Sequence, residues 1–376
     1  MTNKRKQTMR TGGLVAGLHA ALILAVVGAQ PSMAKDPYDK LVSMAKAEMG
    51  KVGGKIRMSL DWPGRDTKKI LPAFKKAFPF VKSIKYKRER GIGPFGRFLI
   101  SWKQGQNPPY DIMHVAGEMQ KQYRDAGAFI KPTFDYRELN KSRPSGSPAI
   151  SELAYSPDGW YLSSAGLVRG NAYNAKLVPK GKEPKTWDAC TNSMWKGRVL
   201  IDSRNKLHAF QYDTKQRKRH IQWLKDMVKN KVVIVQGQGS IAQKVAAGEY
   251  PIACAMNYHT TQRMIDRGAK NLRFTVADVI PLELGTRLYI NKWSVMPATT
   301  QLFAFWLATA GQDMLDKTAY RGFPTNPTNR NYPGSRGKHI SICGPDCVKQ
   351  WGKINAEYQK ILNIPATKKK RRKKKK

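Results

Sequence analysis

Four charged side chains follow segments that are predicted to be strands, and they offer two kinds of chemistry. Asp61 and Glu118 carry carboxylates, which are oxygen ligands for a hard metal ion. Arg65 and Arg204 carry guanidinium groups, whose planar donors match the two oxygens of a carboxylate or phosphate. Asp61 and Glu118 therefore predict ligands of a metal ion, and Arg65 and Arg204 predict bidentate binding of an anion. Trp62 predicts either an aromatic wall over an organic ligand or simple packing.

The loops that carry these residues are predicted to lie at one edge of a layered α/β fold. The β-rich run at 55–60 and the apolar run at 110–115 are each followed by a short loop and a segment with helical spacing. We expect the first of these helices to be capped by Asp66 or Thr67. Ligands of open α/β sheets bind outside the carboxyl ends of the strands, so these loops are the expected site.

Two longer apolar segments, 159–173 and 280–291, predict strands that cross between two such layered units. The region 131–147 is rich in polar residues, proline and glycine, which predicts an irregular surface connection. The apolar segment 298–315 predicts a helix. The remaining strands expected for the second unit are 198–202, 232–235 and 250–256.

The segment Gly91-Ile92-Gly93-Pro94-Phe95-Gly96 has the glycine spacing of a dinucleotide-binding loop. A charged run precedes it where a buried strand is required, and Pro94 stands where the following helix should begin. We therefore reject a Rossmann site and expect a flexible loop here. No GxSxG elbow, HExxH helix or Walker loop occurs in the sequence, so we expect a binding protein and not an enzyme.

Two stretches carry a resemblance to a known family: PKTWDACTNSMWKGRVLID at 184–202 and KVAAGEYPIACAMNYHTT at 244–261. They resemble the second lobe of periplasmic solute-binding proteins of the iron(III)-binding and polyamine-binding type, which deliver cargo to ATP-binding cassette importers. The resemblance runs from about Lys55 to about Gln312. It implies an α/β, type 2 periplasmic binding fold with two lobes, each a mixed sheet flanked by helices, joined by a two-strand hinge. It also implies a membrane permease as partner.

The resemblance and the segment pattern together predict how the chain is divided. We expect a signal peptide at 1–34, a first lobe at 35–168, a second lobe at 169–284, a return to the first lobe at 285–350, and a C-terminal helix with a disordered basic tail at 351–376.

The family also suggests two ligand residues. In iron-binding relatives a pair of adjacent tyrosines after the corresponding strand supplies phenolate oxygens to iron(III), and the resemblance places Tyr258 and His259 at those positions. Only one tyrosine is kept, although imidazole also ligates iron. The alternative is that Tyr258 packs at the edge of the cleft and His259 caps the helix that follows.

The N-terminus predicts export. Four basic residues precede the mostly apolar stretch 12–29, and small residues at Ser32 and Ala34 suit signal peptidase. The alternative, a single membrane anchor, is disfavoured because the stretch is short and contains His19 and several glycines. We expect a soluble, monomeric periplasmic protein.

Four cysteines agree with an oxidising compartment. Cys343 and Cys347 flank a Gly-Pro turn and could close a small loop, and Cys190 and Cys254 fall in the same predicted lobe. A zinc site or free buried thiols are the alternatives.

The formal net charge is +42, and the run 368–376 consists only of lysine and arginine. Such a field attracts anionic solutes and surfaces. The alternative function is therefore binding of polyanions or a membrane surface, although no nucleic-acid fold signature accompanies the charge. The expected solute is a ferric ion, a ferric chelate or a small anion; iron(III) would be cargo, and no cofactor is expected.

Overall fold

The computed structural model describes residues 36–115, 117–325, 332 and 334–365. The predicted signal peptide at 1–34 and the basic run at 368–376 lie outside the described residues. No helix in the described part of the chain is long and apolar enough to cross a membrane.

The strands form a small parallel sheet and a larger mixed sheet. The small sheet has the order β2-β1-β3, and the larger one has the order β11-β10-β5-β8-β6-β7, with β4 paired to β10 and β9 paired to β5. The strands are β1 (Lys55–Ser59), β2 (Ser83–Tyr86), β3 (Ile112–Met113), β4 (Phe129–Ile130), β5 (Tyr161–Asn174), β6 (Val199–Asp202), β7 (Val233–Val235), β8 (Ile252–Asn257), β9 (Leu272–Thr275), β10 (Val279–Asn291) and β11 (His339–Cys343).

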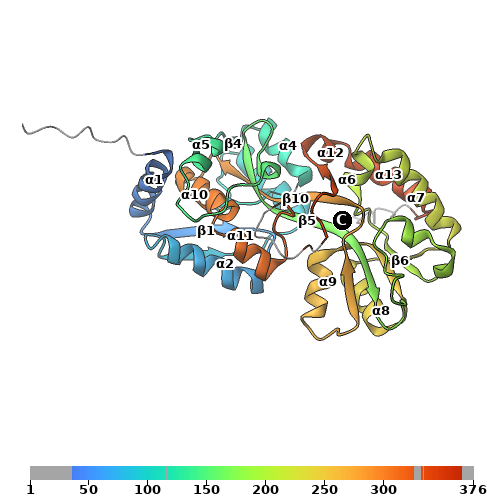
Figure 1. Ribbon diagram of the computed structural model, residues 1–376. Coiled ribbons are helices and arrows are strands. Elements are labelled where there is room, and N and C mark those ends of the chain that lie inside the picture. The colour runs from blue at the N-terminus through green and yellow to red at the C-terminus, as the bar shows by residue number, and fades with distance from the viewer. Residues whose placement is uncertain (1–35, 116, 326–331, 333, 366–376) are drawn as a thin grey trace, which may run out of the picture. The chain divides into compact units, whose positions relative to one another are not determined.

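Helices connect these strands and cover them (Figure 1). The helices are α1 (Pro37–Lys51), α2 (Gly64–Ala77), α3 (Ile92–Lys103), α4 (Gly117–Asp125), α5 (Tyr136–Lys141), α6 (His208–Tyr212), α7 (Arg217–Lys229), α8 (Gln238–Ala247), α9 (Tyr258–Ile265), α10 (Pro297–Ala308), α11 (Gln312–Met314), α12 (Pro345–Lys349) and α13 (Trp351–Ile361). Short 3₁₀ turns are η1 (Glu152–Ala154), η2 (Asp188–Thr191) and η3 (Ser193–Trp195), and η4 (Leu315–Ala319) is π-helical.

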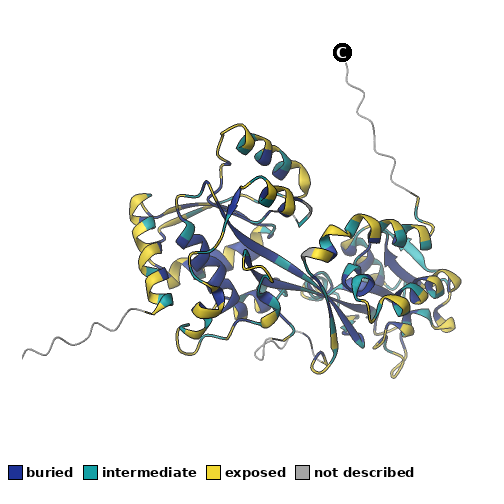
Figure 2. Ribbon diagram, turned by 90° about the horizontal axis from the view of Figure 1, so that it is seen from above, coloured by how far each residue is buried: buried dark blue, intermediate teal, exposed yellow. Residues whose placement is uncertain are grey.

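The strands β5 and β10 are the long elements expected from the apolar segments at 159–173 and 280–291. They pair antiparallel, with Tyr161 opposite Tyr289 and Val168 opposite Leu282. Figure 2 shows that β5 is buried along nearly its whole length. Both faces of strands this long and apolar must be covered, and the two strands link the two largest hydrophobic cores of the described chain.

Each core is built from a different set of elements. The first contains α1, α2 and α10, with Phe74 and Phe303 fully buried, and the second contains β6, β8 and α7, with Trp223 buried. β10 contributes Leu288 to the first core and Val279 to the second. Burial of each such large side chain contributes about 1.5–3 kcal/mol to stability.

The prediction of a flexible loop at Gly91–Gly96 was wrong. The helix α3 begins at Ile92, directly after Gly91, whose φ of 71° breaks the preceding chain direction. Pro94 is tolerated because it stands in the first turn, where backbone N–H groups have no intrahelical partner. Phe95 and Leu99 then bury one face of the helix, and this apolar spacing outweighs the glycines.

Two other predicted segments differ less from the structure. The helix expected to be capped by Asp66 or Thr67 begins at Gly64. The connection 131–147 contains the short helix α5, which Asp135 caps by accepting hydrogen bonds from the N–H groups of Arg137 and Glu138.

Both expected disulfides are present. Cys190 of η2 is bonded to Cys254 of β8, and Cys343 at the end of β11 is bonded to Cys347 of α12. All four residues are fully buried, and none of the cysteines is free.

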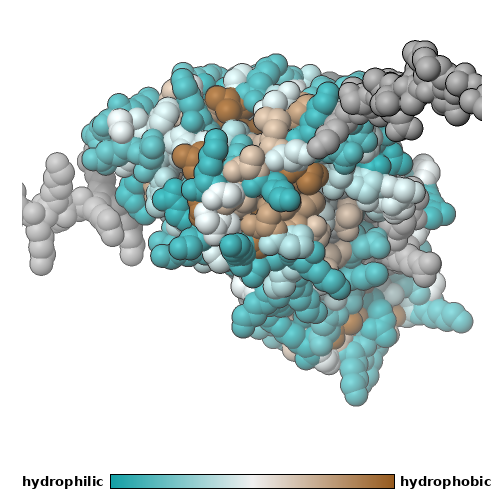
Figure 3. All heavy atoms as spheres, turned by 90° about the vertical axis from the view of Figure 1, so that its left-hand side faces the viewer, coloured by the Kyte–Doolittle hydropathy of each residue, from teal (hydrophilic) through white to brown (hydrophobic). Residues whose placement is uncertain are grey.

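Much of the surface is polar, in keeping with the many lysines and arginines. Figure 3 shows one face of the molecule, where hydrophilic side chains surround a smaller apolar patch.

Candidate functional site

A small polar cavity lies beside the two long strands. Its volume is about 100 Å³. It is lined from β5, from β10, from α4, from the loops after β1 and β3, from the turn after η4, and by the first residue of α13. The lining residues are Asp61, His114, Gly117, Gln120, Ala165, Leu167, Glu283, Leu284, Gly285, Thr286, Arg287, Arg321 and Trp351. The loops after β1 and β3 lie at the carboxyl ends of parallel strands, where α/β folds place their ligands.

Arg321 reaches the cavity from a turn with little conformational freedom. Tyr320 adopts a left-handed conformation, with φ of 56°. A Cβ atom on Gly322 would lie 1.2 Å from Oδ1 of Asp316, so only glycine fits there. The backbone N–H of Gly166 in β5 donates to the carbonyl oxygen of Arg321 at 2.7 Å. The turn is therefore fixed to the strand that lines the cavity.

The acidic residues of the cavity are paired with arginines. Arg88 donates to Asp61 at 3.0 Å, and Arg169 donates to Glu283 at 2.6 Å. Burial opposes ionisation of Glu283, but Arg169 and the other positive groups around it, Arg287 among them, together lower the pKa of that carboxyl. Both carboxylates therefore form their ion pairs with arginines outside the cavity lining, and act on Arg321 only through their charge.

Two histidines near the cavity are held neutral. Burial lowers the pKa of His114, whose Nδ1 lies 3.2 Å from the carbonyl oxygen of Arg287. Burial also lowers the pKa of His259 well below its ordinary value, and the positive charges of Arg321 and Arg263 lower it further. A neutral imidazole carries one N–H donor, which can serve an anion.

Of the residues predicted from the sequence, Asp61 lines the cavity. Trp62 is buried in the first core, and its Nε1 donates to Oγ1 of Thr286 in β10 at 3.0 Å. Arg65 donates to the neighbouring Asp66 at 3.1 Å.

The other predicted residues lie on nearby elements. Arg204 donates through Nε and Nη2 to both oxygens of Asp202, two residues before it. Glu118 belongs to α4, and its side chain lies outside the described residues.

Tyr258 begins α9 and is 8% exposed. Its ring packs edge-on against Phe274, Tyr320 and Tyr332. Burial raises its pKa, which keeps the phenol protonated.

Arg321, Arg287 and Glu283 were not predicted as site residues from the sequence. The sequence did contain a signal for Glu283, which stands inside a long apolar strand. An acidic side chain at such a position is rarely buried unless its charge is paired. Its partner Arg169 stands in a second apolar strand, β5, and could have been identified in the same way.

The described residues do not provide a cluster of three or more His, Cys, Asp or Glu side chains that could hold a metal ion. Iron(III) needs several hard, anionic donors. The cavity offers two carboxylates, and arginines already hold both of them.

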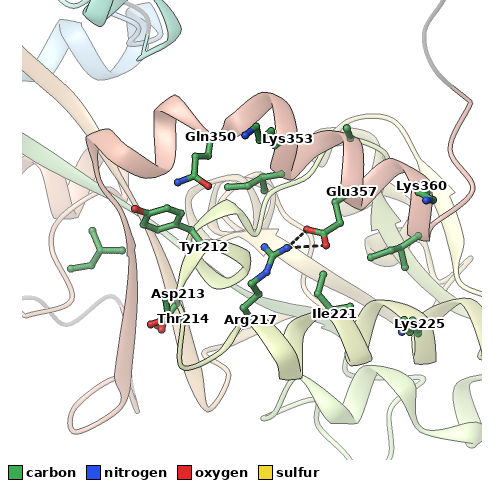
Figure 4. A pocket seen from close by; sticks show the side chains of 14 residues that line it. Tyr212, Asp213, Thr214, Arg217, Ile221, Lys225, Gln350, Lys353, Glu357 and Lys360 are labelled. Carbon is green, nitrogen blue, oxygen red and sulfur yellow. Dashed lines mark hydrogen bonds and ion pairs between the residues drawn. The ribbon is translucent and has the colours of Figure 1, made fainter.

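A larger groove, of about 1290 Å³, lies between α7 and α13 (Figure 4). Its apolar residues include Ile221 and Ile354, and Lys225 and Lys353 stand at its edge. Arg217 donates to both carboxylate oxygens of Glu357 across it.

The fold is that of the type 2 periplasmic binding proteins. Iron-bound HitA from Pseudomonas aeruginosa has a TM-score of 0.58 and 15% identity, over 82% of this chain and 99% of HitA. The apo ferric ion-binding protein A of Pasteurella haemolytica has a TM-score of 0.62 and 14% identity, over 84% of this chain and 100% of that protein. A GABA receptor has a TM-score of 0.60 and 13% identity, over 84% of this chain and 99% of the receptor. No protein-family model and no curated protein sequence matches the chain.

Proposed function

We propose that this chain is the solute-binding component of an ATP-binding cassette import system, exported to the periplasm, where it captures a small solute and presents it to a membrane permease. The solute would occupy the cavity beside β5 and β10. The fold shared with iron-binding and GABA-binding proteins supports this function, because these proteins show that the architecture accepts both metal and organic solutes.

The observation that carries the proposal is the position of the cavity on the two strands that link the cores. Residues around the first core supply Asp61 and His114, and α13, which packs on the second core through Tyr358, supplies Trp351. A solute held there touches groups from both sides. Solute contacts that form only when both sides meet favour closure about the linking strands.

Two contacts away from the cavity support such closure. Arg263 of α9 donates to Asp66 of α2 at 2.5 Å, and Tyr320 donates to Asp266 at 2.6 Å. Asp66 is fully buried, so this ion pair holds α9 against α2. Tyr258 and His259, at the start of α9, would then approach the solute, and their direct contact with it belongs to this proposal.

Native mass spectrometry of the protein isolated without added ligand tests the function. We expect one small molecule or ion bound per chain, absent from the denatured mass. Calorimetry on unfolded and refolded protein, which has lost its solute, would then measure rebinding of the identified compound. A native mass equal to the denatured mass, with no heat from ferric nitrilotriacetate, GABA, malonate or inorganic phosphate, would reject a solute-binding role.

A further inference from the structure

The charges around the cavity are not balanced within the described residues. Asp61 and Glu283 are each engaged by an arginine that is not a lining residue. The two arginines that do line the cavity, Arg287 and Arg321, form no ion pair with a described carboxylate. Positive charge therefore exceeds negative charge where a solute would lie.

The hydrogen bonds of these two arginines lead to the same conclusion. Arg287 donates to the amide oxygen of Gln120 at 3.2 Å and to the carbonyl oxygen of Cys343 at 3.1 Å, both neutral groups. Arg321 donates no side-chain hydrogen bond to a residue that the structure describes, and the Nε atoms of both arginines are buried with no partner among those residues. Buried cationic donors of this kind are costly unless an anion accepts from them.

We propose that the solute is a compact oxyanion, with a carboxylate or phosphoryl group that accepts hydrogen bonds from Arg321 and is stabilised by the charge of Arg287. This inference rests on the proposed function and names its substrate class. The fork of an arginine matches two oxygens of either group.

The size of the cavity limits the solute further. A volume of about 100 Å³ holds several water molecules and so accommodates an anion with a small number of non-hydrogen atoms. The indole of Trp351 forms one wall, and its Nε1 is engaged by Sγ of Cys343 at 3.1 Å, which leaves an apolar ring facing the solute. An anion with a short apolar part fits this combination.

A bare ferric ion fits less well. Arg287 and Arg321 would repel it, and the nearby Arg263 adds a third positive charge. The buried Tyr258 would also have to lose its proton to act as a phenolate donor, and burial raises its pKa. The same positive groups favour an anion.

Calorimetry with inorganic phosphate, methylphosphonate and malonate tests the proposal, with ferric nitrilotriacetate and spermidine as competitors of other classes. We expect at least one oxyanion to bind, or the native mass spectrum to show a bound acid. Arg321→Gln should then weaken binding of that compound about 100-fold, because a charge-assisted contact is lost. Arg321→Lys, which keeps the charge without the fork, should cost about tenfold.

Arg267→Gln is the matched control, because it removes the same charge from an exposed position in the turn after α9. It should change affinity less than twofold, and circular dichroism should show that all three variants are folded. Binding of iron or spermidine as the native solute would leave the proposed function intact and overturn the oxyanion assignment. An oxyanion that binds Arg321→Gln as tightly as the natural chain would also overturn it. If no compound of any class binds, the proposed function itself fails.

Discussion

The cavity beside β5 and β10 and the groove between α7 and α13 are both lined by basic residues, but they differ in how the charge is compensated. In the larger groove, Arg217 is held by both oxygens of Glu357. In the smaller cavity, Arg321 has no carboxylate partner among the described residues, and its Nε is buried. A buried arginine without an ion pair among the described residues, and not volume, therefore distinguishes the candidate solute site.

The difference between the groove and the cavity also has an energetic cause. The Arg217 and Glu357 side chains are 47% and 34% exposed, so water screens both charges and neither needs a ligand. At the cavity the Nε atoms of Arg287 and Arg321 are buried, and a bound anion would interact more strongly with these less hydrated guanidinium groups.

The largest effect on stability is expected from the disulfides, which lie in different regions. Cys190–Cys254 joins residues 64 apart within the second core, and Cys343–Cys347 joins residues 4 apart in contact with Arg287 and Trp351 of the cavity. By the entropy of loop closure, replacing the first pair by alanine should cost about 4 kcal/mol and the second about 2 kcal/mol. Urea unfolding of the two double variants measures both values.

The affinity for the solute should change in the opposite order, with the larger loss in the variant without Cys343–Cys347. The carbonyl oxygen of Cys343 accepts from Arg287, so loss of the short disulfide should disturb the cavity and weaken solute binding. Loss of Cys190–Cys254 should leave the affinity of the folded protein within about twofold. Equal losses of affinity in both variants would contradict the separation of the two regions.

Gly322→Ala is expected to have the next largest effect, at the turn that presents Arg321. The added Cβ would overlap the Asp316 carboxylate, so the turn must move, at a cost of about 1–3 kcal/mol in stability and with a loss of solute binding. Thermal unfolding and calorimetry measure the two effects.

Gly352→Ala in α13, beside the groove, is the matched control. No atom lies within 4 Å of the added Cβ, and the site is helical, so we expect a gain of about 0.5–1 kcal/mol. If Gly322→Ala were as harmless as this control, the turn would not position Arg321 as we infer.

The sequence predicted the elements around the cavity better than the residues within it. β5 and β10 were recognised because long apolar segments are evident without tertiary information. The sequence alone did not distinguish Arg65 and Arg204 from Arg321, because only the folded chain shows which of these arginines lacks an ion pair with a described carboxylate. A local signal did exist: Asp66 adjoins Arg65, and Asp202 precedes Arg204 by two residues.

The helix at Ile92–Lys103 could not be predicted from its glycines and proline. Its stability depends on burying Phe95 and Leu99 against residues that are distant in the sequence, such as Tyr123, whose hydroxyl donates to the carbonyl oxygen of Phe95. Such tertiary contacts outweigh local propensity.

A smaller effect is expected from His220, which lies behind the groove wall. It is fully buried between Phe210 and Trp223, and neither ring nitrogen has a hydrogen-bond partner within the described residues. Burial, and secondarily the charge of Arg217, lowers its pKa to about 3.

The unfolded chain therefore binds a proton at His220 near pH 6.5, whereas the folded chain binds it only near pH 3. Stability at this site should fall as the pH decreases through that interval, by at most about 1.4 kcal/mol per pH unit. His220→Phe should remove this contribution, which urea unfolding at pH 7 and pH 5 can measure. An unchanged pH dependence in the variant would exclude His220 as its source.

The smallest effect is expected from Glu357→Gln, which tests the central comparison directly. The substitution removes the carboxylate partner of Arg217 and so gives the groove an arginine without an ion pair, as in the cavity. Because both side chains are partly exposed, stability should change by less than about 1 kcal/mol. The affinity for the oxyanion should stay within twofold, and calorimetry should detect no second binding site, because water screens the released charge. A second site in this variant would show that an unpaired arginine is sufficient for binding, and that burial of Arg321 does not distinguish the cavity from the groove.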